Sequence, residues 1–231
     1  MKFGDQPLPE MTIEGTAAPA VHGLFEPGWM RLMSAEPSWA VSIHRPGDPA
    51  RERVERFLES AYARAFDSSL RRHFPILLSV EDGSGEVQAA AGIRFARDQA
   101  LYLEQYLDDP IEVAGAQALQ QGVARDEIAE VGNLSSESPI ASLRLFLAIA
   151  EHLTGEGCAY AAATATRQLR RKFGRMGFAT RLLAEARASR LAPGADDWGR
   201  YYAREPAVLL GAITPALDRL QVIVSAGGCA A

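Results

Sequence analysis

Apolar residues recur at intervals of three and four positions in the segment DPARERVERFLESAYARAF, residues 48–66. This spacing places them on one side of an α-helix, and Asp48 and Pro49 are typical residues for its start. The apolar positions are Val54, Phe57, Leu58, Ala61, Tyr62, Ala65 and Phe66. The pattern therefore predicts an amphipathic helix that packs one face against a core.

Strand-like runs alternate with further helical patterns along the rest of the chain. Two runs, PILLSVED and VQAAAGIRFA, are joined by DGSGE, whose two glycines predict a hairpin. Strands are also predicted in WAVSIHR, at residues 127–134, in CAYAAATAT and in AVLLGAI. Helices are predicted near EVAGAQALQQG, from residue 139 to a glycine at 155 or 157, in RQLRRKFGRMG, and after residue 215. This order predicts an α/β fold with a mixed sheet covered by helices on both faces.

Composition narrows the possible functions. The 231 residues are 48% hydrophobic and 23% charged, which is typical of a globular chain of one large domain or a domain with arms. The net charge of −5 argues against nucleic acid as a partner. Two cysteines give no disulfide framework, and no paired His/Cys spacing predicts a metal site. No run approaches the ~18 apolar residues that span a bilayer, and MKFGDQPLPE has no apolar signal segment. We therefore expect a cytoplasmic protein without integral membrane association.

Two polar residues interrupt an apolar strand in EVGNLSS, residues 130–136. Glu130 and Asn133 lie among Ile128, Val131 and Leu134, and buried polar groups are costly unless they are paired. Strict alternation would point the two side chains to opposite faces. A β-bulge at Gly132 would bring both to one face and free a backbone N–H. The alternatives are a functional site, or a surface-facing glutamate beside an ordinary glycine kink.

Several segments resemble known families. RQLRRKFGRMGF is similar to the late segment of Gcn5-related N-acetyltransferase folds, in which the acyl donor lies between the fourth and fifth strands. Across residues 40–214 the chain resembles the thermostable hemolysin family, in the motifs RERVERFLESAYARAF, LYLEQYLDDPIE, EVGNLSS, LRRKFGRMGF and WGRYY. The resemblance implies a mostly antiparallel sheet flanked by helices, similar to acyl-homoserine-lactone synthases and long-chain N-acyl amino acid synthases. It divides the chain into an arm with a first strand (1–49), an acyltransferase-like domain (50–214) and a C-terminal helix and tail (215–231).

The resemblance implies transfer of an acyl chain from a thioester to a small amine. This reaction needs a donor to the developing oxyanion and a base for the amine proton. The Gly132 N–H would be the donor and Glu130 the base, while Asn133 would position the substrate. Further candidates are catalytic Glu104 and the substrate-binding residues Arg94, Asp108, Glu112, Ser135 and Thr164. Each candidate has a functional and a structural interpretation. The acids either form an amine-binding wall or cap a helix, and Arg94 either contacts the substrate or makes a structural salt bridge. Thr164 either lines the acyl channel or only contributes strand propensity.

The turn after the EVGNL strand, SSESPIAS, bears on the acyl donor. Acetyltransferases usually hold the coenzyme A pyrophosphate on a glycine-rich turn, whereas this turn has no glycine and carries Glu137. Lactone synthases lack that turn too and use acyl carrier protein. We therefore expect a phosphopantetheine thioester as co-substrate, on acyl carrier protein rather than on coenzyme A, and no permanently bound cofactor. A cluster of basic residues on one predicted helix could dock an acidic carrier: Arg167, Arg170, Arg171, Lys172 and Arg175. The alternative interpretation of this cluster is a solvated helix face.

Two other functions remain open at this point. The family name implies a membrane-active haemolysin, and the fold also allows a non-catalytic acyl-binding module. The sequence leaves the acyl length, the acceptor and the oligomeric state undetermined.

Overall fold

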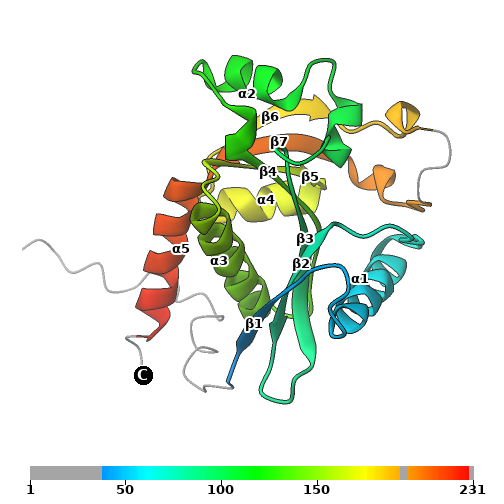
Figure 1. The fold of residues 1–231 in the computed structure, drawn as a ribbon, viewed down its shortest axis with the longest axis vertical. Helices are drawn as coiled ribbons and strands as arrows, with labels where there is room; N and C mark the ends of the chain where they lie inside the picture. The colour runs from blue at the N-terminus through cyan, green and yellow to red at the C-terminus, as the bar shows by residue number, and fades with distance from the viewer. Residues whose placement is uncertain (1–37, 193–196, 229–231) are drawn as a thin grey trace, which may run out of the picture.

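The computed structural model describes residues 38–192 and 197–228, which form a seven-stranded sheet in the order β1-β2-β3-β4-β5-β7-β6 (Figure 1). The strands are β1 (Ala40–His44), β2 (Ile76–Glu81), β3 (Val87–Phe95), β4 (Ile128–Ser136), β5 (Tyr160–Ala165), β6 (Thr180–Glu185) and β7 (Ala207–Ala212). All neighbouring strands are antiparallel except the central pair β4 and β5. The predicted mixed, mostly antiparallel sheet is confirmed.

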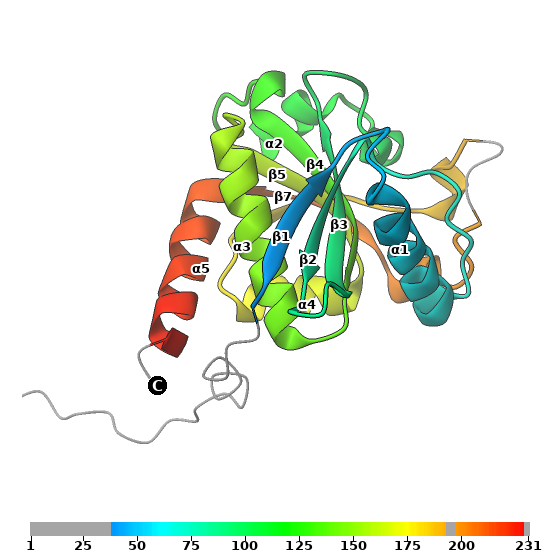
Figure 2. The same cartoon turned by 60° about the horizontal axis from the view of Figure 1, so that its bottom comes forward.

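The helices lie on both faces of this sheet. They are α1 (Arg51–Phe66), α2 (Ile111–Leu119), α3 (Pro139–Gly155), α4 (Arg167–Arg175) and α5 (Ile213–Gly228), with short 3-10 turns η2 (Tyr102–Tyr106), η3 (Arg125–Glu127), η4 (Ala188–Arg190) and η5 (Tyr202–Arg204). In both views α1 lies on the opposite side of the sheet from α3 and α5 (Figures 1 and 2).

The alternation of side chains in the strands supplies a core to each face. On the α1 face, Val54 and Leu58 pack with Leu77 of β2 and Ala90 of β3. The next residue along β2, Leu78, faces the other way and joins a cluster with α3 and α5. Because helices cover both faces, all six residues of β2 are buried, including the polar Ser79 and Glu81, unlike in a strand with one face in water.

The start of α3 follows its sequence signals. Ser138 has an extended backbone, and its side chain accepts a hydrogen bond from the Ala141 N–H. Pro139 occupies the first helical position, where the missing N–H is not needed. This cap fixes the direction in which the chain leaves β4 and therefore shapes the region at the end of that strand.

Two elements differ from the sequence predictions. The edge strand β6 was not predicted, because its exposed and half-buried residues do not alternate. Helix α5 begins at Ile213, directly after β7, since Pro215 is tolerated in a first helical turn. Most of the predicted N-terminal arm lies outside the described residues, so the proposed division at residues 49 and 214 stays a prediction.

Candidate acyl-transfer site

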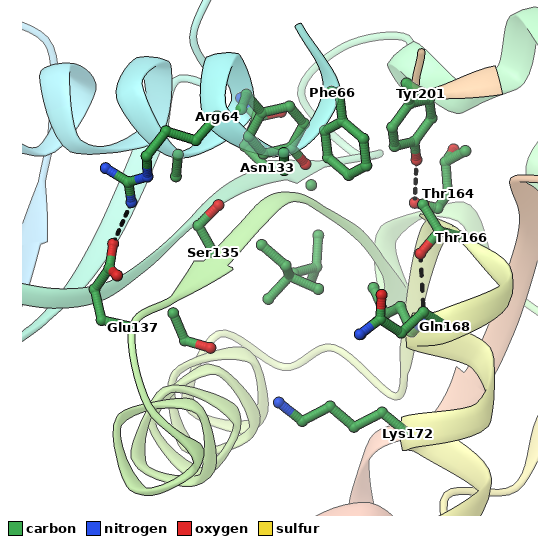
Figure 3. A pocket seen from close by; sticks show the side chains of 18 residues that line it. Arg64, Phe66, Asn133, Ser135, Glu137, Thr164, Thr166, Gln168, Lys172 and Tyr201 are labelled. Carbon is green, nitrogen blue, oxygen red and sulfur yellow. Dashed lines mark hydrogen bonds and ion pairs between the residues drawn. The ribbon is translucent and has the colours of Figure 1, made fainter. Parts of the chain in front are cut away.

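The central sheet opens where the parallel pair ends. β4 pairs with β5 from Ile128 to Glu130, but both strands continue beyond the last pair. The widening gap borders a cavity of about 460 Å³, which we call the large cavity of the site. It is lined by the second half of β4, the C-terminal turns of α1, the first turns of α4, and Thr164. Figure 3 shows Ser135, Thr164, Gln168 and Lys172 around this opening. The opening lies between the two strands that the sequence comparison associated with the acyl donor.

A β-bulge lies at this opening. Gly92 of β3 pairs with Gly132, whereas Ala90 pairs with Ser135, so Ala91 alone faces two residues of β4. These two are Asn133 and Leu134, and Asn133 has a positive φ of 50°. Asparagine enters this left-handed region more readily than most residues. The predicted bulge is therefore present, but its extra residue follows Gly132 rather than being Gly132.

Gly132 is required for a different reason. A Cβ atom added there would lie 2.3 Å from Cζ of Phe74, and one added at its partner Gly92 would lie 2.5 Å from the same side chain. The two paired glycines, which have no side chains, therefore let the Phe74 ring pack directly against the strand backbone on the α1 face. The bulge then places Asn133 beside Glu130, since both residues line a second cavity of about 40 Å³ next to Phe74, which we call the small cavity.

Glu130 is a buried carboxylate with a raised pKa. Its side chain is 2% exposed. One oxygen accepts the Tyr102 N–H at 2.7 Å, and the other accepts the Leu103 N–H at 3.1 Å. Burial raises the pKa of Glu130 to about 7, and the Arg94 guanidinium at 4.0 Å opposes the shift only in part. A carboxylate that is half ionised near neutral pH is suited to accept a proton from a substrate.

Arg94 lies at the edge of this arrangement. Its guanidinium stacks over the Phe74 ring, with 5.0 Å between the guanidinium carbon and the ring centroid. Its Nε is buried without a hydrogen-bond partner among the described residues. The structure therefore places Arg94 near Glu130, as an ion-pair partner at the limit of contact.

Glu104 is held in a structural ion pair. Its two oxygens bind the two terminal nitrogens of Arg125 at 2.7 and 2.9 Å, and they also accept the backbone N–H groups of Leu101 and Ile111. The hydrogen bonds from Arg125 lower the pKa of Glu104 to about 2. A carboxylate this acidic is a poor base at neutral pH, so we leave Glu104 out of the proposed site.

The other two acids also bind arginines. Glu112 lies 2.8 Å from the same Arg125, and the exposed Asp108 lies 2.9 Å from Arg190. The three acids therefore do not form the expected amine-binding wall. Sequence reasoning missed Arg125, because 21 residues separate it from Glu104 and nothing in its own surroundings marks it.

The basic residues of α4 fall into two groups. Arg167 and Arg170 contact Glu205, through its carboxylate at 3.5 Å and its carbonyl oxygen at 3.1 Å. Arg171 is exposed and borders a shallow cavity on the same side. Lys172 instead lines the large cavity (Figure 3), and its Nζ donates to Ser142 Oγ of α3. Burial lowers the pKa of Lys172.

The polar candidates Ser135 and Thr164 both line the large cavity. Thr164 also borders the small cavity, and its Oγ1 is buried without a hydrogen-bond partner in the described part of the chain. Tyr201 donates its hydroxyl hydrogen to the Thr164 carbonyl oxygen at 2.9 Å. Thr164 therefore lies at the junction of the two cavities with an unused hydroxyl.

The aromatic residues of the WGRYY motif were not among the predicted site residues. In the structure, the segment that follows residue 196 lies against the end of α1, where the Arg200 N–H donates to the Phe66 carbonyl oxygen. It brings Trp198 and Tyr201 to the small cavity beside Glu130. The aromatic-rich composition of DDWGRYY was the only sequence signal for this placement.

An apolar cavity of about 100 Å³ lies behind β4, on the α3 and α5 face. Val131 and Leu134 border both this cavity and the large one. Its other walls are apolar side chains of α3, β5, β7 and α5, with Phe146, Phe173 and Phe178 in mutual ring contact.

The model of the family described as thermostable hemolysin matches residues 44–217 of this sequence. The chain belongs to the thermostable hemolysin family. The resemblance stated from the sequence motifs is thereby confirmed. A search of curated proteins by sequence finds no match.

Solved structures with a similar fold are synthases of acylated products. The acyl-homoserine lactone synthase LasI is 12% identical, with 77% of this chain and 91% of LasI covered and a TM-score of 0.52. BjaI, a CoA-dependent acyl-homoserine lactone synthase solved with SAM and isopentyl-CoA, is 15% identical over 81% and 90%, with a TM-score of 0.55. FeeM, an N-acyl amino acid synthase from uncultured soil microbes, is 13% identical over 77% and 91%, with a TM-score of 0.52. At these identities the likeness establishes the fold.

The comparison also corrects one premise. Because BjaI is CoA-dependent, likeness to lactone synthases does not by itself favour acyl carrier protein over coenzyme A.

Within the described residues, no helix is long and apolar enough to cross a membrane. The same residues contain no group of three or more His, Cys, Asp or Glu side chains placed to hold a metal ion.

Proposed function

We propose that this thermostable hemolysin family member is an N-acyltransferase that moves an acyl chain from a thioester to an amine. The observation that carries the proposal is the buried Glu130 next to a β-bulge, at the point where β4 and β5 separate. A polar group in such a strand is costly, and an ionisable one with a pKa shifted toward neutrality is typical of an active site.

The proposed reaction uses Glu130 as the base. The amine nitrogen attacks the thioester carbonyl carbon, a C–N bond forms and the C–S bond breaks. Glu130 takes the proton released by the amine, directly or through a water, and the proton passes on to the leaving thiolate. The extra residue of a bulge is left out of the strand ladder, so a backbone N–H at Asn133 or Leu134 is a candidate donor to the developing oxyanion.

The cavities supply a path for the donor. A further cavity of about 620 Å³, between the start of α3, α4 and α5, shares Gln168 and Lys172 with the large cavity. We place the phosphopantetheine arm along these two cavities, with the thioester carbonyl at the bulge. The acyl chain then passes between β4 and β5 into the apolar cavity, because Val131 and Leu134 border both spaces.

The start of α3 favours acyl carrier protein as the donor in this proposal. Glu137 lies before the helix and pairs with Arg64 (Figure 3), while the Ala141 N–H is already capped by Ser138. These contacts leave a poor binding site for a pyrophosphate. The exposed arginines of α4 are placed to meet an acidic carrier, and acyl-coenzyme A is the alternative donor.

Mass spectrometry of lipid extracts tests the proposal. Cells producing the wild type should accumulate N-acylated amines that are absent from cells without the protein. Glu130→Gln should abolish them, whereas Glu52→Gln, an exposed change on α1, should not. Equal lipid profiles for the wild type and Glu130→Gln would exclude Glu130 as the base.

The family description makes membrane lysis the second candidate function. In our proposal any haemolysis is indirect and comes from an N-acylated product with detergent character. Direct lysis would require an apolar face exposed to lipid, yet the apolar residues of α3 are buried against the sheet.

A further inference from the structure

The small cavity beside Glu130 has walls of unusual composition. Its volume is about 40 Å³, about three times the roughly 10–15 Å³ of such space that holds one water. Its lining includes Glu130, Asn133 and Thr164, together with the aromatic side chains Tyr62, Phe74, Tyr102, Tyr106, Trp198 and Tyr201. The space therefore accommodates the end of a molecule, such as an amine nitrogen and its nearest carbon atoms.

The aromatic walls are held in place by one another. Trp198 donates its ring N–H to the Tyr102 hydroxyl at 3.0 Å, and its ring centroid lies 6.3 Å from that of Tyr62 and 5.3 Å from that of Tyr201. Packed rings that make these contacts keep the cavity open without a bound ligand. Such a site is largely formed in advance, which lowers the ordering cost of binding.

The charges of this cavity favour a cation and oppose an anion. Glu130 is the only carboxylate among its described lining residues, which include no lysine, arginine or histidine. Aromatic faces attract ammonium groups, and a carboxylate strengthens that attraction. An α-amino acid carries a carboxylate one carbon from its nitrogen, so binding its amine here would bring that anion next to Glu130 and the aromatic rings. Such a contact is unfavourable because the anion would lose water, and the adjoining cation, Arg94, already faces Glu130 at 4.0 Å.

We propose that the acceptor is a primary amine without a carboxylate on the carbon next to the nitrogen. This inference rests on the proposed acyl transfer and specifies its acceptor class. The ammonium enters the small cavity and loses one proton to solvent. The neutral amine then attacks the thioester, Glu130 accepts its second proton and passes it to the leaving thiolate, and the remainder of the acceptor lies in the large cavity. The two cavities share Tyr62, Gly132, Asn133, Thr164 and Tyr201, so a single molecule can occupy both.

Matched acceptors test the proposal with the wild-type protein. Tyramine and tyrosine differ only in the carboxylate, as do ethanolamine and serine. Each would be supplied with acyl carrier protein or coenzyme A thioesters, and the amide product measured by mass spectrometry. We expect each amine to be acylated at least about tenfold faster than its amino acid. Equal or faster acylation of the amino acids would overturn the acceptor assignment while leaving acyl transfer intact.

Calorimetric titration without any acyl donor separates the two proposals. Tyramine should bind the wild type, and Trp198→Leu should weaken its binding about tenfold through loss of the ring. Glu52→Gln, an exposed change on α1 away from both cavities, should leave the affinity unchanged. Binding of tyramine but not tyrosine, without acylation of either, would support the acceptor site and refute the proposed enzyme activity. Equal binding of tyramine and tyrosine would refute the acceptor site, whether or not the variants fold.

Discussion

The buried position of Glu130 has a consequence for stability that can be measured without a substrate. Its pKa rises from an ordinary 4.5 to about 7 in the folded protein, so folding favours the protonated form. The stabilisation is complete below about pH 4.5 and is lost as the pH rises through about 7. The shift corresponds to about 3 kcal/mol of unfolding free energy, at 1.36 kcal/mol for each pKa unit.

Glu130→Gln removes this titration, because glutamine is neutral at every pH. The change also has a cost that does not vary with pH, since the amide cannot accept both the Tyr102 and Leu103 N–H groups. The free energy of unfolding of the variant, minus that of the wild type, should therefore rise by about 2.5 kcal/mol between about pH 5 and pH 8.5.

Chemical denaturation followed by circular dichroism across this pH range measures the difference. Glu104→Gln is the matched control, because the pKa of Glu104 is lowered to about 2 in the folded protein. The stabilisation from Glu104 is present above about pH 4.5, so this variant should be displaced from the wild type by a constant amount between pH 5 and 8.5. If the Glu130→Gln and wild-type curves were also parallel, Glu130 would not have a raised pKa, and the argument for it as a base would fail.

Three further predictions concern packing, donor and membranes. Gly132→Ala should lower the free energy of unfolding by about 1–3 kcal/mol, because the added methyl group clashes with Phe74. Combining it with Phe74→Leu should restore part of this stability. If the losses of the two single variants simply added, the clash would not be the cause. Arg170→Glu with Arg171→Glu, as well as added salt, should slow association of acyl carrier protein in surface plasmon resonance; unchanged association would argue against docking on α4. Purified, detergent-free protein without acyl donor should not release dye from liposomes; prompt leakage in proportion to protein concentration would establish direct lysis.

The fold was largely predictable because its signals are local. The three- and four-residue spacing in α1, the glycines between β2 and β3, and the Pro139 start of α3 all lie within the elements that they specify. Strand β6 was missed because it pairs only with β7, at the edge of the sheet, and shows no alternation. Its place depends on a partner strand that comes later in the sequence.

The site was predictable only in part, because its long-range contacts leave no local pattern. Glu130 and Asn133 stand out as polar residues in an apolar strand, and the structure brings both to one cavity. The bulge follows Gly132, and Gly132 itself lies against Phe74, a contact that no local sequence pattern indicates. The expected wall of acids failed for the same reason, since Arg125 binds Glu104 and Glu112 from a separate segment.

Turnover of an acyl thioester and an amine by the purified protein decides whether Glu130 acts as the base of an acyltransferase. Wild-type kcat/KM should rise with pH through about 7, following ionisation of Glu130. Glu130→Gln should lower turnover by roughly 10²–10⁴-fold and lose this rise, while Glu52→Gln should behave as the wild type. Equal turnover and equal pH profiles for the wild type and Glu130→Gln would contradict the account.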